Sequence, residues 1–127
     1  MSSMYAENVV DHYKFPRNFG RLENADIKAR DVNPLCGDEI GFDIELDNNQ
    51  KMKNVKFNGR GCAICMATSS MLTEKIMGKD IDEIEKLSGR DVIDLLKIEI
   101  SPNRMKCAML PLAVLKLALE THRNKVQ

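Results

Sequence analysis

The chain has 127 residues, of which 30% are charged and 43% hydrophobic, and its 19 basic residues balance 19 acidic ones. This length fits a single domain, residues 1–127, whose core folds without disulfide bonds. The zero net charge argues against non-specific binding to nucleic acid or to an anionic membrane. The first residues lack the features of a signal peptide and no apolar run reaches the length of a membrane span, so we expect a cytoplasmic protein.

The N-terminal half is predicted to form a helix, a loop and an antiparallel sheet. Phe15-Pro16 should end the helix, because the residue before a proline avoids the α region. Apolar residues alternate strictly with small or acidic ones from Ile40 to Leu46, which indicates a strand with one buried face. A turn cluster then joins this strand to an antiparallel partner. The predicted elements are a helix over 4–14, a loop over 16–24 and strands over 26–33, 40–46 and 55–58.

The C-terminal half is predicted to be helical. Apolar residues recur there at helical spacing, and the predicted helices cover 63–77, 81–88, 92–97 and 108–122. Residues 98–105 lack this pattern and are predicted to be irregular. Pro111 should lie in the first turn of the last helix, where a missing N–H group costs no hydrogen bond, so Cys107 should open that helix. Strands first and helices after predict an α+β fold: a small antiparallel β-sheet with helices packed on one face.

Three of the four cysteines are predicted at junctions between loops and regular elements. Cys36 lies in a turn flanked by proline and glycine, and Cys62 and Cys107 each open a predicted helix. A helix N-terminus favours the thiolate, which is the form that binds metal and attacks sulfur. Glycines beside Cys36 and Cys62 should leave the backbone bare, so that a metal centre or a partner's loop can approach. In a reducing compartment these cysteines should bind metal or act in catalysis rather than form disulfides.

Cys65 follows Cys62 by one helical turn and is predicted to be a small buried hydrophobe. A redox disulfide or half of a zinc site are weaker alternatives, because the chain shows no βαβ context and no second Cys-x-x-Cys pair. Asp38 could complete a tetrahedral zinc shell together with three thiolates. A role as a simple turn residue remains the alternative for Asp38, since Gly-Asp is ordinary turn chemistry.

Four groups of residues resemble the motifs of the IscU/NifU-type family of iron–sulfur cluster scaffolds. They occur in the family's order and cover nearly the whole chain: Asp11-His12-Tyr13-Lys14 with Pro16-Arg17-Asn18, then Pro34-Leu35-Cys36-Gly37-Asp38, then Gly61-Cys62 with Ala67-Thr68-Ser69-Ser70, and finally Lys106-Cys107-Ala108-Met109-Leu110. The resemblance implies a compact fold of a sheet and helices (SufE/NifU-like). It also implies a 2Fe-2S cluster on three cysteines, which here are Cys36, Cys62 and Cys107, and on one further ligand. Asp38 is the candidate for this ligand, with Lys106 or an external group as the alternatives.

The same resemblance implies partners. A cysteine desulfurase would supply the sulfur, and acceptor apoproteins would receive the cluster. A homodimer of the cluster-bound form is left open, and zinc could bind to the cluster-free form.

The last motif departs from the usual IscU pattern, which has His directly before the final cysteine where this chain has Lys106. Arg104-Met105-Lys106-Cys107 resembles instead the Arg-x-Lys-Cys motif of the SufU branch, whose members hold zinc through three cysteines and the Asp of Cys-Gly-Asp. SufU proteins carry an insertion before this motif, whereas only the short segment 98–103 precedes it here. The Leu-Pro-Pro-Val-Lys segment that docks the dedicated Hsp70 chaperone in bacterial IscU is absent, so the sequence does not support recognition by that chaperone.

Two functions of different classes follow. The first is a scaffold that holds a transient cluster and catalyses no reaction on a small molecule. The second is a zinc-dependent sulfurtransferase that accepts persulfide sulfur from a cysteine desulfurase. A structural zinc domain is disfavoured, because the chain has enough apolar faces to fold without metal.

Sulfur delivery is predicted to involve chiefly Cys107, with Cys36 as the alternative acceptor. Cys107 is expected at a helix start beside Lys106, whose ammonium can lower the pKa of the thiol or balance an anionic cluster. Arg104 could act in the same way or bind a partner. Cys62 is expected to lie deeper, behind the preceding strand.

Overall fold

The computed structural model describes residues 3–34 and 37–126. Its three strands form one antiparallel sheet in the order β1-β2-β3. The elements in chain order are α1 (Ser3–Lys14), β1 (Ile27–Asn33), β2 (Asp38–Leu46), β3 (Met52–Arg60), α2 (Ala63–Ile76), α3 (Ile81–Glu85), α4 (Gly89–Leu96) and α5 (Pro102–Val126). Within the described ranges, none of these helices is long and apolar enough to cross a membrane.

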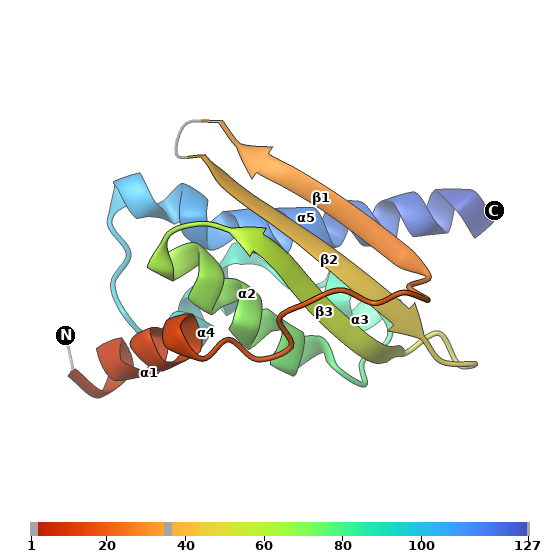
Figure 1. The fold of residues 1–127 in the computed structure, drawn as a ribbon, viewed down its shortest axis with the longest axis horizontal. Coiled ribbons are helices and arrows are strands. Elements are labelled where there is room, and N and C mark those ends of the chain that lie inside the picture. The colour runs from red at the N-terminus through yellow and green to blue at the C-terminus, as the bar shows by residue number, and fades with distance from the viewer. Residues whose placement is uncertain (1–2, 35–36, 127) are drawn as a thin grey trace.

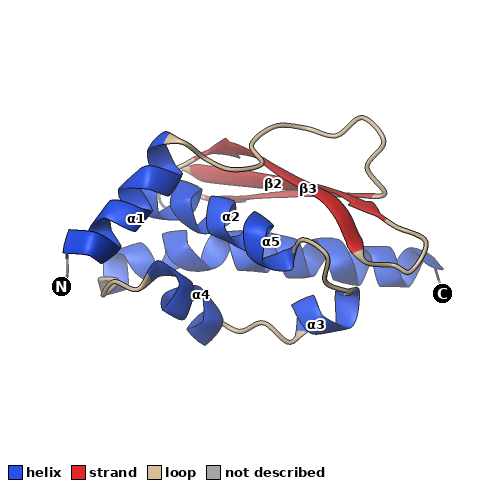
Figure 2. Ribbon diagram, turned by 90° about the horizontal axis from the view of Figure 1, so that it is seen from below, coloured by secondary structure: helices blue, strands red, loops and turns tan. Residues whose placement is uncertain are grey.

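The helices lie on one face of the sheet, as Figure 2 shows. α5 packs against β1 and β2, and α2 packs against β3. The residues of β2 that alternate toward these helices are fully buried, namely Ile40, Phe42 and Ile44. This arrangement confirms the predicted α+β fold and the predicted alternation, because every second residue of the central strand enters the core.

The opposite face of the sheet is crossed by residues 15–26, which run from α1 to the far edge at β1 (Figure 1). The Gly20 N–H donates to the carbonyl of Phe57 at 2.8 Å, so this segment adds backbone hydrogen bonds along the edge of β3. The Leu22 N–H donates to the carboxylate of Asp43 at 2.9 Å. Asp43 is a residue of β2 that points away from the helices, and this crossing segment explains why it is only 4% exposed.

Buried polar side chains attach α1 to α2. The Ser70 hydroxyl of α2 lies 2.8 Å from Nδ1 of His12 and accepts a hydrogen bond from the Arg17 N–H at 2.8 Å. Because the Arg17 N–H already donates to this hydroxyl, the hydroxyl is well placed to donate its own proton to Nδ1. His12 is 7% exposed, and α1 therefore carries a buried imidazole at its contact with α2.

The middle helices differ from the prediction at their ends. α4 begins at Gly89 rather than at residue 92, because Ser88 and Asp91 form a capping box in which the Ser88 N–H donates to the Asp91 carboxylate at 2.7 Å. α3 begins at Ile81 as predicted, after an Asp80 cap, but it ends at Glu85.

The last helix begins earlier than predicted. α5 starts at Pro102, within the stretch predicted to be irregular, because proline suits the first position of a helix, where its N–H is not needed. The carbonyl of Ser101 accepts the backbone N–H groups of Arg104 and Met105, which closes the first turn. Pro111 consequently lies inside the helix, where it interrupts the ladder of backbone hydrogen bonds. The expectation that Cys107 opens this helix is therefore wrong, since Cys107 lies within it.

Candidate metal centre

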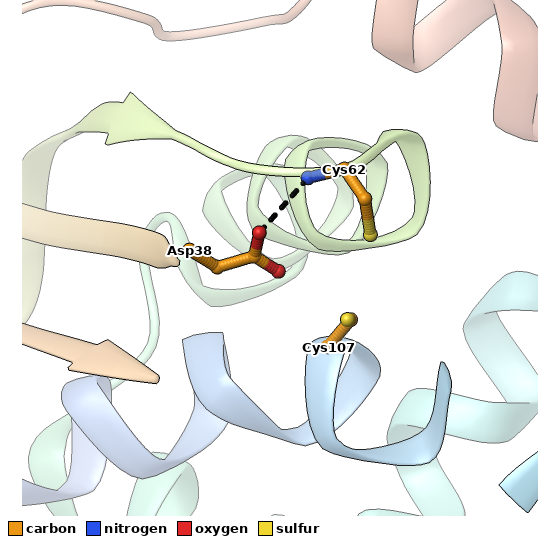
Figure 3. A group of neighbouring side chains, drawn as sticks. All are labelled: Asp38, Cys62 and Cys107. Atoms are coloured by element: carbon orange, nitrogen blue, oxygen red, sulfur yellow. Dashed lines mark hydrogen bonds between the residues drawn. The ribbon is translucent and has the colours of Figure 1, made fainter. Parts of the chain in front are cut away.

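Three side chains from three different elements converge at one end of the sheet. Asp38 is the first residue of β2, Cys62 is the N-cap of α2 just after β3, and Cys107 comes from α5. Their ligand atoms, one carboxylate oxygen and two sulfurs, all lie within 4.8 Å of one another. Figure 3 shows the carboxylate pointing toward the two sulfurs. Asp38 and Cys62 come together because β2 begins, and β3 ends, at the same end of the antiparallel sheet.

The Asp38 side chain is buried with only part of its hydrogen-bonding capacity used. It is 4% exposed, and its Oδ1 accepts the Cys62 N–H at 3.2 Å. Its Oδ2 is buried and has no hydrogen-bond partner among the described residues. A buried carboxylate oxygen without a partner is costly unless another charge compensates it. Asp38 is therefore suited to hold a cation, and this role accounts for it better than a turn does.

The two sulfurs differ in exposure, and the difference is opposite to the prediction. Cys62 is half-buried, whereas Cys107 is 2% exposed. The helix N-terminus that was expected to favour a thiolate at both positions exists only at Cys62. Neither helix position nor depth now favours Cys107 over Cys62 as the first sulfur acceptor, so the role of Cys107 as acceptor stays a prediction.

Arg104 interacts with both sulfurs. The charges of Cys62 and then of Cys107, with hydrogen bonds to both sulfurs, raise the pKa of Arg104 above its ordinary value. Arg104 precedes Cys107 by three residues and so shares its side of the helix. Lys106 is the immediate neighbour of Cys107 and, like Arg104, is exposed, so the contact with both sulfurs and not exposure distinguishes Arg104. The role predicted for Lys106 thus suits Arg104 better, and the three-residue spacing within a helix was the signal for it.

Cys65 packs in the core, as predicted. It lies in α2 and is fully buried. Burial raises the pKa of the Cys65 thiol far above its ordinary value, and the negative charge of Asp38 adds to the effect. A thiol in this environment is a poor nucleophile and a poor metal ligand, because both roles require the thiolate.

Cys36 lies outside the described residues, so its predicted place among the ligands stays a prediction. The connection that contains it joins β1 to β2, and the residues that flank this connection, Asn33 and Asp38, are register partners in the sheet. The Gly37 N–H donates to the Asn33 carbonyl at 2.8 Å. The chain therefore enters and leaves the Cys36 segment at the same end of the sheet as the three converging side chains.

The donor set suits zinc or iron. Two thiolates on one tetrahedral zinc ion at about 2.3 Å would lie about 3.8 Å apart, so the 4.8 Å spread needs only a small contraction. Thiolates are also the usual ligands of iron–sulfur clusters. The carboxylate is a harder ligand than the sulfurs and binds such clusters less well. A mixed site of this kind can hold metal and can also release it.

Comparison with known proteins agrees with this site. The model of the NifU-like N terminal domain family matches residues 4–127. The chain is 38% identical to a Drosophila melanogaster protein named iron–sulfur cluster assembly enzyme IscU, over 98% of this chain and 82% of the relative. It is 31% identical to the Escherichia coli iron–sulfur cluster assembly scaffold protein IscU, over 95% of each chain.

Solved structures show the same fold. A Fervidobacterium islandicum protein described as an iron–sulfur cluster assembly scaffold for the SUF system superposes with a TM-score of 0.79 at 30% identity, over 94% of this chain and 99% of that chain. An N-terminal NifU-like protein from Brucella abortus gives a TM-score of 0.77 at 14% identity, over 95% of each chain. The latter likeness concerns the fold alone.

Proposed function

We propose a function for this chain from the premise that it belongs to the family of NifU-like N-terminal domains. It is a scaffold on which iron–sulfur clusters are assembled, as is the Escherichia coli relative named iron–sulfur cluster assembly scaffold protein IscU. The cluster is cargo rather than a resident cofactor: the scaffold receives iron and sulfur, holds the product briefly and gives it to acceptor apoproteins. In this role the chain catalyses no reaction on a small-molecule substrate.

The convergence of Asp38, Cys62 and Cys107 within 4.8 Å is the observation that carries the proposal. A 2Fe-2S cluster requires four protein ligands, and we expect Cys36 to complete this set. Because Cys62 is only half-buried, iron and acceptor proteins can reach the site. The carboxylate of Asp38 is a harder ligand than a thiolate, so its bond to the cluster is weaker and exchanges more readily.

Sulfur is expected to come from a cysteine desulfurase as persulfide. A thiolate of the scaffold attacks the terminal sulfur of the desulfurase persulfide, the sulfur–sulfur bond breaks, and the desulfurase cysteine leaves as a thiolate. Cys62 and Cys107 are the described candidates, because both contact Arg104, whose positive charge favours an anionic sulfur.

A zinc-dependent sulfurtransferase is the second candidate function. Two thiolates and a carboxylate form three of the four ligands of an ordinary zinc site, and the Arg-x-Lys-Cys motif resembles that of the SufU branch. In this alternative, zinc stays bound, and sulfur passes through one cysteine without a cluster forming on the chain.

Anaerobic reconstitution separates the two candidates. The protein is incubated with ferrous iron, cysteine, a cysteine desulfurase and dithiothreitol, which reduces the persulfide sulfur to sulfide, and its visible absorption, iron, sulfide and zinc are measured. Persulfide is mapped by mass spectrometry in a parallel incubation without dithiothreitol. A scaffold gains the visible absorption of a cluster, with iron and acid-labile sulfide in equal amounts. A protein that retains zinc, accepts persulfide and gains no visible absorption is the sulfurtransferase.

A further inference from the structure

Gly61 immediately precedes Cys62 and lies against the side chain of Asp38. A Cβ atom on Gly61 would lie 3.0 Å from Cγ of Asp38, 3.1 Å from its Oδ1 and 3.1 Å from Cβ of Cys65. Favourable contacts between such atoms begin at about 3.5 Å. A side chain at position 61 would therefore crowd the carboxylate of the candidate metal centre, which would have to shift by a few tenths of an ångström.

The backbone at this position does not require glycine. The glycines of the described residues with a positive φ are Gly20, Gly37, Gly59 and Gly78. Gly61 is not among them, so an alanine could adopt its backbone conformation without strain. The expectation that this glycine bares the backbone for a metal or for a partner's loop stays a prediction; the structure shows that a Cβ at this position would meet Asp38.

We infer that Gly61 is a positioning residue, whose missing side chain sets where the Asp38 carboxylate lies relative to the sulfurs of Cys62 and Cys107. The carboxylate has little freedom to adjust. It is 4% exposed, and its bond from the Cys62 N–H, at 3.2 Å, is already at the long end of such bonds. A methyl group pressing on Oδ1 lengthens this bond and moves Oδ2, which no described residue satisfies, away from the sulfurs of Cys62 and Cys107.

Cobalt binding tests the inference without any cluster. Co²⁺ is added to the metal-free wild type and to the variants Gly61→Ala, Asp38→Ala and the double variant, and the visible spectrum of the bound ion reports which ligands it has. Gly61→Ala is expected to lose the carboxylate ligand and to give the spectrum of Asp38→Ala. The double variant is expected to match both, because the two substitutions remove the same ligand.

Cluster lifetime provides a second readout, and this part rests on the proposed function. Gly61→Ala keeps all the cysteines and is expected to lengthen the lifetime of a bound cluster in the same direction as Asp38→Ala. A general loss of structure would instead shorten the lifetime of the bound cluster. Gly41→Ala is the matched control, since a Cβ there would also be crowded, 2.9 Å from Oδ1 of Asn58, but on the outer face of the sheet. It should leave the cobalt spectrum and the cluster lifetime unchanged.

If Gly61→Ala folds poorly, unfolding by urea provides a further test. Removal of the Asp38 carboxylate relieves most of the crowding, so the double variant is expected to unfold at a higher urea concentration than Gly61→Ala. A double variant no more stable than Gly61→Ala would overturn the inference. So would identical cobalt spectra for wild type and Gly61→Ala, or for wild type and Asp38→Ala. A wild type that binds cobalt through Asp38 but assembles no cluster refutes the proposed function and leaves Gly61 to be judged on cobalt alone.

Discussion

Replacement of Asp38 by alanine should show whether its carboxylate serves metal binding or the stability of the fold. The substitution removes the hydrogen bond from the Cys62 N–H at 3.2 Å, and a bond to a charged acceptor contributes about 1.5–3 kcal/mol. It also removes a buried carboxylate, one oxygen of which has no partner in the described part of the chain, and burial of such an ion costs several kcal/mol. The two effects nearly cancel, so we expect the free energy of unfolding of the metal-free protein to be unchanged or about 1 kcal/mol higher.

Asp43→Ala is the matched control for this substitution. Asp43 lies in the same strand, is equally exposed at 4%, and also accepts a backbone N–H, from Leu22 at 2.9 Å. Its partner belongs to the segment that crosses the outer face, so its loss should cost about 1–3 kcal/mol. Urea unfolding of both metal-free variants gives the comparison, and the lifetime of a reconstituted cluster in air gives the functional readout. Only Asp38→Ala should lengthen that lifetime.

The refuting result is specific. If Asp38→Ala destabilises the metal-free protein by more than about 2 kcal/mol, or as much as Asp43→Ala does, the carboxylate serves the fold. A cluster lifetime that is unchanged or shorter in Asp38→Ala would show that this ligand is not the source of lability.

Further predictions concern the cysteines and His12. Replacement of Cys36, Cys62 or Cys107 by serine should abolish stable cluster binding, whereas Cys65→Ser should keep most of it; equal loss in all four, measured by visible absorption, would place Cys65 among the ligands. Mass spectrometry after incubation of metal-free protein with desulfurase and cysteine should find persulfide on Cys62 or Cys107, and label chiefly on Cys65 would contradict the role given to Arg104. Burial, aided by Arg17, lowers the pKa of His12, so the unfolded chain binds more protons and stability is lost as pH falls below about 6.5. His12→Gln should flatten this fall in urea unfolding between about pH 8 and about pH 5, and an unchanged slope would show that other groups cause it.

The strands were the most predictable part of the fold. Period-two alternation from Ile40 to Leu46 identified the central strand and its buried face, and the turn after it identified the hairpin. The ends of the helices were less predictable, because capping interactions determine where a helix begins and ends. The spacing of apolar residues does not reveal these interactions. Ser88 with Asp91, and Ser101 with Pro102, were helix-start signals present in the sequence.

Three of the predicted site residues lie together in the structure, but their relative depth could not be predicted. Motif order identified Asp38, Cys62 and Cys107, which the structure brings together. The greater depth of Cys107 depends on how α5 packs against the sheet, which no local pattern reports. The crowding between Gly61 and Asp38 joins residues far apart in the sequence, so it too became visible only in three dimensions.

Cluster transfer tests the central claim most directly. The reconstituted protein is mixed with an apo-ferredoxin in the presence of an iron chelator, and circular dichroism follows the cluster as it moves from one protein to the other. We predict that the acceptor gains its cluster faster than from the same concentrations of free iron and sulfide, and that the chelator does not intercept it. Transfer no faster than from free ions, or abolished by the chelator, would contradict the assignment of this chain as a scaffold.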